Sequence, residues 1–204
     1  MPDLDRAPAT AARLLDLLVR RSYLYRPDAP FVLASGKTSP MYIDCRLTTT
    51  YAEAIPLIGE LCFHRVVAMG RGVAPAAVGG LTLGADPIAA AVSFYGTAAA
   101  QPISWFTVRK EAKQHGTARW IEGSVEAGAR VVVVDDVVTT GGSTLTAIER
   151  CRAYGLTVIG ALVLVDRGEE NGRRRIEAAL GADGSFGSIF TRTDLDAAWQ
   201  AQRR

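Results

Sequence analysis

The sequence predicts an α/β fold in which a parallel sheet is flanked by helices and preceded by a small N-terminal hood. Five short runs are continuously apolar and often β-branched, as strands buried on both faces are: residues 66–69, 74–78, 103–108, 131–134 and 161–165. Two segments with helical character, residues 87–92 and 143–154, lie between these runs. This alternation of strand and helix is typical of a parallel sheet covered by helices.

The ends of the chain carry simpler signals. An amphipathic helix is expected near the start, because Leu14 and Leu18 repeat at helical spacing. Residues 31–44 mix β-type residues with glycine and proline, which predicts the strands and turns of the hood. Near the end of the chain, Thr193 is expected to cap a last helix, with Asp196 three residues further on.

Length and composition indicate one ordinary domain. The 204 residues are 49% hydrophobic and 22% charged, so residues 1 to about 60 are expected to form the helix and hood and the remainder the core. A formal net charge of +2 gives no broad basic field, so nucleic acid is not an expected partner. Residues 87–108 lack charge but are interrupted by glycine and prolines, so no membrane span is expected.

The three cysteines, Cys45, Cys62 and Cys151, have no paired spacing. This pattern fits reduced thiols and argues against a disulfide framework or a zinc site. The first six residues also lack the basic start and apolar run of a signal peptide. A cytoplasmic protein is therefore expected.

The most informative segment follows the apolar run at 131–134: two aspartates and then a loop rich in hydroxyls and glycines, which opens a helix. Gly141 and Gly142 let the backbone approach a ligand, and the helix start offers unpaired N–H groups. Thr139, Thr140 and Ser143 add hydroxyl donors. The segment lacks the lysine of a Walker A loop, so it predicts a cradle for a phosphomonoester rather than a P-loop for a nucleotide.

Asp135 and Asp136 would repel a polyphosphate placed beside them, but they suit the two hydroxyls of a ribose. The expected ligand is therefore a sugar phosphate. The alternative, an Asp pair that only caps the helix, is disfavoured by the strand before it and the loop after it. A proton-sharing dyad is also disfavoured, because the donors of the loop are expected to keep both carboxylates ionised.

A second segment, residues 108–123, gathers cations beside Gly116 and has few apolar anchors. It could be a solvated loop, the common reason for such a run, or a lid over a polyanion. The aspartate and glycine segment resembles the phosphoribosyl pyrophosphate signature of type I phosphoribosyltransferases, which implies that pyrophosphate leaves a ribose. That departure needs cations and exclusion of water, which favours the lid. The cationic or protonatable residues are Arg109, Lys110, Lys113 and His115.

These two segments resemble, respectively, the phosphoribosyl pyrophosphate (PRPP) signature of type I phosphoribosyltransferases and the catalytic loop of orotate phosphoribosyltransferases. The resemblance implies a type I phosphoribosyltransferase core, dependence on Mg²⁺ and a homodimer whose lid loop reaches the neighbouring subunit's site. It implies catalytic roles for Lys113, His115, Asp135 and Asp136. The expected PRPP-binding residues are Arg109, Lys110, Lys113, His115, Asp135, Asp136, Val137, Val138, Thr139, Thr140, Gly141, Gly142 and Ser143.

A charged cluster at residues 164–169 ends another buried run and carries the expected orotate site. A guanidinium can hold the carboxylate of orotate with two hydrogen bonds, whereas a surface charge cluster is the alternative. Resemblance to the family's Asp-Arg-x-Glu element assigns orotate to Arg167, with Thr139 under the pyrimidine and Tyr42 and Ile43 lining the pocket from the hood. Residues 78–88 resemble the family's pyrophosphate loop.

Two positions depart from the family pattern. Ala34 and Leu83 stand where many or some members carry lysine, which removes positive charge that Lys37 or Arg71 could replace. The expected activity is Mg²⁺-dependent transfer of the phosphoribosyl group from PRPP to orotate. Protein metal ligands are not expected, since Mg²⁺ keeps waters and binds substrate phosphates. The alternatives are a transferase for another base and a non-catalytic regulator that senses PRPP.

Overall fold

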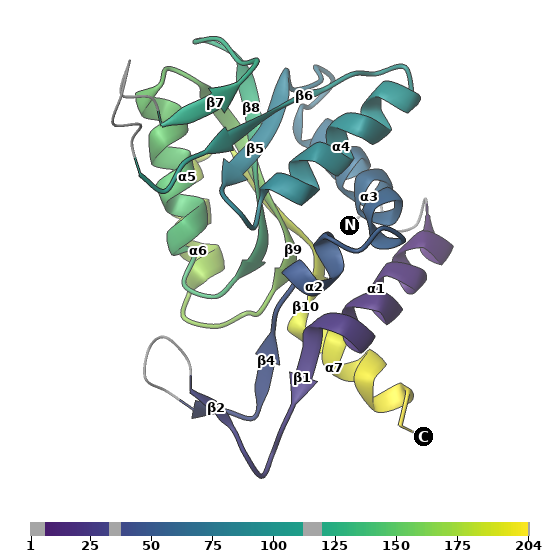
Figure 1. Ribbon diagram of the computed structural model, residues 1–204. Helices are drawn as coiled ribbons and strands as arrows, with labels where there is room; N and C mark the ends of the chain where they lie inside the picture. Colours follow the sequence, from purple (N-terminus) through teal and green to yellow (C-terminus); the bar gives the residue numbers. More distant parts are fainter. Residues whose placement is uncertain (1–6, 33–37, 112–119, 204) are drawn as a thin grey trace.

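The computed structural model describes residues 7–32, 38–111 and 120–203. Its centre is a six-stranded sheet with the order β10-β9-β8-β5-β6-β7, in which β7 alone runs antiparallel to its neighbour (Figure 1). The strands are β5 (Ala77–Leu81), β6 (Ser104–Val108), β7 (Ile121–Gly123), β8 (Arg130–Val138), β9 (Thr157–Asp166) and β10 (Ser185–Thr191).

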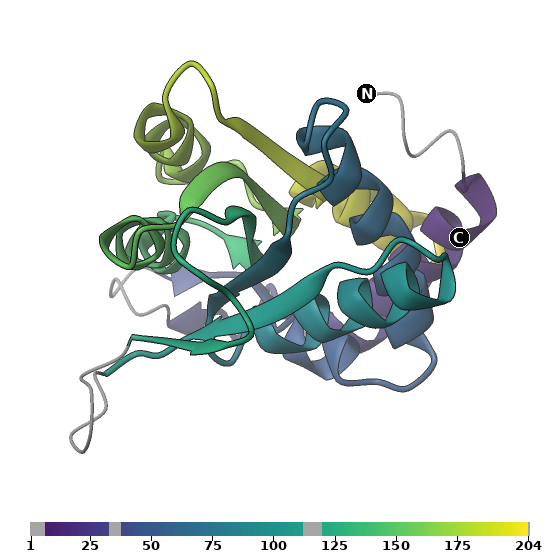
Figure 2. The ribbon, with the colours of Figure 1, turned by 90° about the horizontal axis from the view of Figure 1, so that it is seen from above.

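Helices cover both faces of this sheet (Figure 2). One face packs on α1 (Pro8–Ser22), α3 (Ala54–Met69), α4 (Asp86–Ala98) and α7 (Arg192–Ala201), and the other on α5 (Gly142–Ala153) and α6 (Gly172–Leu180). In β8, Val132 and Val134 face the first layer, while Val131 and Val133 face the second. Both faces are buried, so the run is continuously apolar, and the predicted α/β class is confirmed.

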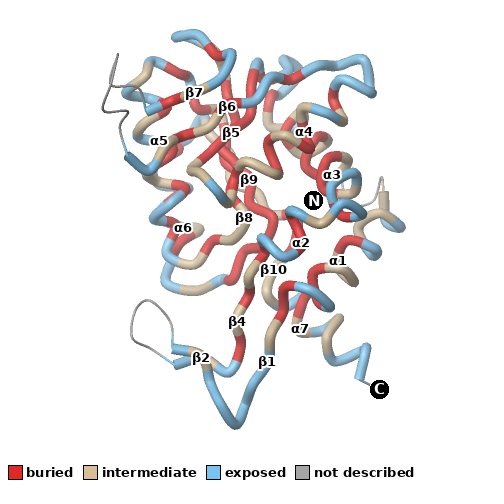
Figure 3. Tube along the Cα trace, viewed as in Figure 1, coloured by how far each residue is buried: buried red, intermediate tan, exposed pale blue. Residues whose placement is uncertain are grey.

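The hood consists of short strands and one short helix between α1 and α3. Its elements are β1 (Tyr23–Tyr25), β2 (Phe31–Val32), β3 (Thr38–Ser39), β4 (Met41–Ile43) and α2 (Arg46–Thr49). Strand β4 pairs antiparallel with β1, and this pairing extends away from the buried sheet to an exposed tip at residues 25–30 (Figure 3). The hydroxyl of Tyr23 donates to Asp196 at 2.5 Å, which ties the hood to α7.

Three expectations about elements were wrong. Residues 66–69 form the end of α3 rather than a strand, because the helix is apolar around most of its surface and its β-branched end looks like a strand. The strand expected at 74–78 exists as β5, but it begins and ends three residues later, at Ala77–Leu81. It includes two glycines, and Gly79 is required because a Cβ there would lie 2.1 Å from the Phe106 carbonyl oxygen. The cap of α7 is Thr191, which accepts from the Asp194 amide, and not Thr193.

The remaining predicted strands correspond to β6, β8 and β9, and the predicted helices to α1, α4 and α5. The three cysteines are buried and free. No helix within the described ranges has the length and hydropathy needed to span a membrane.

The order of the strands creates one special position in the sheet. From β5 the chain moves outward to β6 on one side, and β8 then returns to the other side of β5, followed by β9 and β10. Open α/β sheets bind ligands at such a switch point, beyond the carboxyl ends of the two strands. Here those ends lead into residues 82–85 and 139–141.

Candidate active site

The loop after β8 forms a small polar cavity at the start of α5. Gly141 adopts a left-handed conformation with φ 77°, which lets the chain turn directly into the helix. The cavity has a volume of about 150 Å³, and it is lined by Asp135, Val137, Thr139, Thr140, Gly141, Gly142, Ser143 and Thr144. Hydroxyls and the N-terminus of a 12-residue helix therefore converge on a space of the size that a phosphate group needs.

Val138 is the one residue of the predicted loop whose side chain points elsewhere. It is 1% exposed and packs in the core between the sheet and α5 and α6. Its carbonyl oxygen accepts from the Arg167 amide at 3.1 Å, which places the end of β9 beside the phosphate loop.

Asp135 and Asp136 lie at the end of β8 and are held by local donors. Asp135 is 4% exposed and accepts from the Thr144 hydroxyl at 2.9 Å and from the Asp136 amide at 3.0 Å. Burial, with the charge of Asp136 added, nevertheless raises the pKa of Asp135 to about 7. Burial also raises the pKa of Asp136. Contrary to expectation, the loop donors do not hold the pKa of Asp135 low, because the loss of water on burial outweighs their effect.

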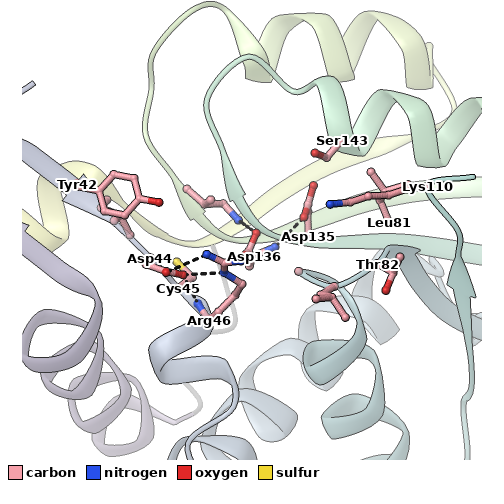
Figure 4. A pocket seen from close by; sticks show the side chains of 14 residues that line it. Tyr42, Asp44, Cys45, Arg46, Leu81, Thr82, Lys110, Asp135, Asp136 and Ser143 are labelled. Atoms are coloured by element: carbon pink, nitrogen blue, oxygen red, sulfur yellow. Dashed lines mark hydrogen bonds and ion pairs between the residues drawn. The ribbon is translucent and has the colours of Figure 1, made fainter. Parts of the chain in front are cut away.

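A larger pocket of about 250 Å³ opens beside the two aspartates, between the hood and the loop after β5 (Figure 4). Its walls are Tyr42, Ile43, Asp44, Cys45, Arg46, Leu81, Thr82, Leu83, Gly84, Lys110, Asp135, Asp136, Val137 and Ser143. The hood residues Tyr42 and Ile43 thus share a pocket with the aspartate pair, and so does the predicted pyrophosphate loop. Gly84 fits closely there, since a Cβ would lie 2.8 Å from an Asp136 carboxylate oxygen.

Of the four predicted lid cations, the structure describes Lys110 and Arg109, and their side chains have different surroundings. Lys110 lines the pocket and points toward Asp135 (Figure 4), whereas Arg109 lies 3.5 Å from Glu122 of β7. Lys113 and His115 lie outside the described residues, as do Ala34 and Lys37 of the hood.

Arg167 follows β9 and is 9% exposed. It makes an ion pair with Glu169 at 2.9 Å, and Glu169 in turn contacts Arg192 of α7 at 2.7 Å. The Arg167 Nε is buried and makes no hydrogen bond within the described parts of the chain. Arg167 does not line the pocket of Tyr42, and Thr139 lines the phosphate cavity instead.

Sequence reasoning missed several residues at the site. Cys45 and Arg46 line the pocket directly after the predicted hood residues, and Arg46 is paired with Asp44 at 2.9 Å. Two arginines of α6 also lie near the site: Arg173 pairs with Asp166 at 2.9 Å, and Arg175 donates to the Thr140 carbonyl at 2.7 Å. Their proximity to the loop depends on the packing of α6, which leaves no local signal.

The fold and the site define a class of protein. A phosphate loop, two carboxylates and a facing backbone loop meet at the switch point of a parallel sheet. In agreement, residues 73–181 match the family model of the phosphoribosyl transferase domain.

Relatives narrow this class. The chain is 47% identical over 165 residues to the orotate phosphoribosyltransferase of Aquifex aeolicus, which covers 81% of this chain and 87% of that protein. It is 40% identical over 203 residues to the enzyme of the same name from Nostoc sp., which covers 96% and 93%. The chain therefore belongs to the orotate phosphoribosyltransferase family of transferases.

Solved structures agree with this assignment. A crystal structure of Mycobacterium tuberculosis orotate phosphoribosyltransferase has a TM-score of 0.76 at 38% identity and covers 91% of this chain and 98% of that chain. The same enzyme solved in complex with PRPP has a TM-score of 0.69 at 34% identity, covering 92% of both chains.

Proposed function

We propose that the protein catalyses Mg²⁺-dependent transfer of the 5-phosphoribosyl group from PRPP to orotate, giving orotidine 5′-phosphate and pyrophosphate in pyrimidine biosynthesis. The observation that carries the proposal is the phosphate cavity of α5, which lies next to Asp135 and Asp136 and opens beside the pocket of Tyr42. A 5-phosphate in the cavity places the ribose over the aspartates. The related Mycobacterium tuberculosis enzyme has been solved with this same substrate.

Each part of the substrate has a corresponding part of the site. The backbone and hydroxyls at 139–143 bind the 5-phosphate, and Asp135 and Asp136 accept hydrogen bonds from the ribose hydroxyls. The loop at 82–85, with Lys110, Arg109, Lys113 and His115, receives the pyrophosphate. As the bond to pyrophosphate lengthens, positive charge grows on the ribose and negative charge on the leaving group, so cations on the pyrophosphate side lower the barrier.

Orotate is the nucleophile through a ring nitrogen, so the protein needs no nucleophile of its own. Arg167 binds the orotate carboxylate, Thr139 lies under the ring, and Tyr42 and Ile43 close the pocket from the hood. The buried Nε of Arg167, which makes no hydrogen bond in the described chain, is a donor available for this carboxylate. A transferase for an uncharged base has no use for this donor, and a regulator that only senses PRPP has no use for either the donor or the lid cations.

The site fits Mg²⁺ that arrives with the substrate. Asp135 and Asp136 present carboxylate oxygens at the pocket, while its third carboxylate, Asp44, is paired with Arg46; among the described residues, no group of three acidic, histidine or cysteine side chains could hold a metal ion by itself. A Mg²⁺ ion brought by the substrate would lie near Asp135 and Asp136, and it would supply positive charge for the departing pyrophosphate.

We also infer a homodimer that shares the lid segment at residues 108–123, in the reducing cytoplasm. An uncharged surface beside β6 supports a dimer interface: Phe94 of α4 is 79% exposed and Trp105 is 42% exposed, and both line one apolar depression. The hairpin that carries the lid begins at this same strand. Cys45, Cys62 and Cys151 are buried free thiols, which is typical of a protein in a reducing compartment.

An ultraviolet assay of base consumption with PRPP tests the function. Orotate should be consumed, with the rate lost when Mg²⁺ is chelated, while hypoxanthine, adenine and uracil should not be. Consumption of another base in preference to orotate, or PRPP binding without turnover, would overturn the proposal.

A further inference from the structure

Arg150, in the last turn of α5, contacts three points at the base of the β6–β7 hairpin. Its guanidinium donates to the carbonyl oxygen of Arg109 and, at 3.2 Å, to that of Lys110. The same group stacks on the ring of Trp120, with the guanidinium carbon 3.9 Å from the ring centre. We call Arg109, Lys110 and Trp120 the hairpin root.

The hairpin root is the outermost pairing of the two arms among the residues that the structure describes. The Arg109 amide donates to the Trp120 carbonyl at 2.8 Å, beyond the register pair of Val108 with Ile121. Arg150 therefore holds both arms at once, through carbonyls on one and a ring on the other. Only arginine can do both, because its planar fork has several donors and a face that stacks, while lysine has a single compact charge.

Helix α5 also carries the phosphate cavity at its opposite end. Gly142 begins the helix, and Arg150 lies eight residues further on, roughly 12 Å along the axis at 1.5 Å per residue. One rigid helix thus joins the phosphate cavity to the hairpin root. Lys110, whose carbonyl Arg150 holds, lines the pocket together with Asp135 and Ser143.

We propose that Arg150 is a positioning residue for PRPP, because it fixes the backbone of Arg109 and Lys110 relative to the phosphate cavity. The inference rests on the proposed function in that Lys110 faces the pyrophosphate of PRPP. Arg150 does not line the pocket, so it acts through the hairpin root and does not touch the substrate.

Arg152 provides a matched control on the same helix. Its guanidinium also donates to a backbone carbonyl, that of Ala179 in α6 at 2.7 Å, but it contacts no part of the hairpin root. Arg150→Gln should raise the KM for PRPP and lower kcat/KM for PRPP by roughly tenfold or more, as small misplacements of binding groups do. The KM for orotate should change little. Arg152→Gln should match the wild type, and Arg150→Lys should recover part of the loss.

Hydrogen exchange supplies a readout that does not depend on turnover. The Arg109 amide should exchange faster in Arg150→Gln than in the wild type or Arg152→Gln, while amides within α5 stay protected. The inference is overturned if Arg150→Gln and Arg152→Gln behave alike, or if Arg150→Gln weakens both substrates equally and lowers the melting temperature as well. If the wild type binds PRPP without consuming orotate, the proposed function fails, but weaker PRPP binding by Arg150→Gln still supports the positioning role.

Discussion

Replacing Arg167 by alanine should weaken orotate far more than PRPP. The guanidinium is nearly buried, with 7% of the side chain exposed, so its bonds to a bound carboxylate form away from water. Two charge-assisted hydrogen bonds contribute about 1.5 to 3 kcal/mol each, and the existing contact with Glu169 reduces the net gain. We therefore expect a loss of about 3 kcal/mol, or about a hundredfold in kcat/KM for orotate.

The fold should survive this change, because Glu169 keeps its 2.7 Å contact with Arg192 and no carboxylate is left alone. The measurement is steady-state kinetics with each substrate varied while the other is saturating, together with a melting curve. Arg192→Ala is the control: it removes the other partner of Glu169 but leaves Arg167 in place, so it should cost much less. An equal loss for both substrates in Arg167→Ala would refute the assignment of Arg167 to orotate.

Three further predictions concern the carboxylates and the dimer. Asp136→Asn keeps the shape of the side chain but removes the carboxylate that accepts hydrogen bonds from the ribose hydroxyls. Turnover should therefore fall sharply while the melting curve stays unchanged, and wild-type turnover would show that the aspartate pair has only a structural role. Unfolded Asp135 loses its proton near pH 3.9, and folded Asp135 only at about 7, so stability should fall as pH rises between these values. Denaturant titrations at several pH values should show that the free energy of unfolding falls less steeply with pH in Asp135→Asn than in the wild type. The same pH dependence in both proteins would contradict the raised pKa. Mixed homodimers of Lys113→Ala and Arg167→Ala should regain activity at roughly a quarter of the sites after random exchange, and no recovery would exclude a shared lid.

The phosphate loop and the sheet could be predicted because their signals are local. The valines of β8 are buried on both faces, and the glycines and hydroxyls that follow lie within one stretch of chain. The prediction of a strand at residues 66–69 was wrong for a related reason. The last turns of this apolar helix contain no Gly or Pro, so their composition is the same as that of a buried strand. The two structures differ here in length: the helix runs for 16 residues before Gly70, which is longer than an ordinary strand.

The contacts between distant segments could not be predicted. Arg150 is 41 residues from Arg109, and its role depends on where α5 lies relative to the hairpin. The same holds for Arg175 and Thr140, which are 35 residues apart. The raised pKa of Asp135 likewise depends on burial by the completed fold, whereas its hydrogen-bond donors were visible in the sequence.

The source of positive charge in the pocket follows from the same geometry. Leu83 lines the pocket and is 67% exposed, and its apolar side chain supplies no charge there. Arg71 does not supply that charge within one subunit, because it lies in the turn between α3 and β5, whereas the pocket lies beyond the other end of β5. Of the cations among the described pocket residues, Arg46 is already paired with Asp44, which leaves Lys110 to face the aspartates. The position of Lys110 therefore decides how positive charge faces the aspartates in this pocket, and Arg150 influences PRPP binding through the backbone of Lys110.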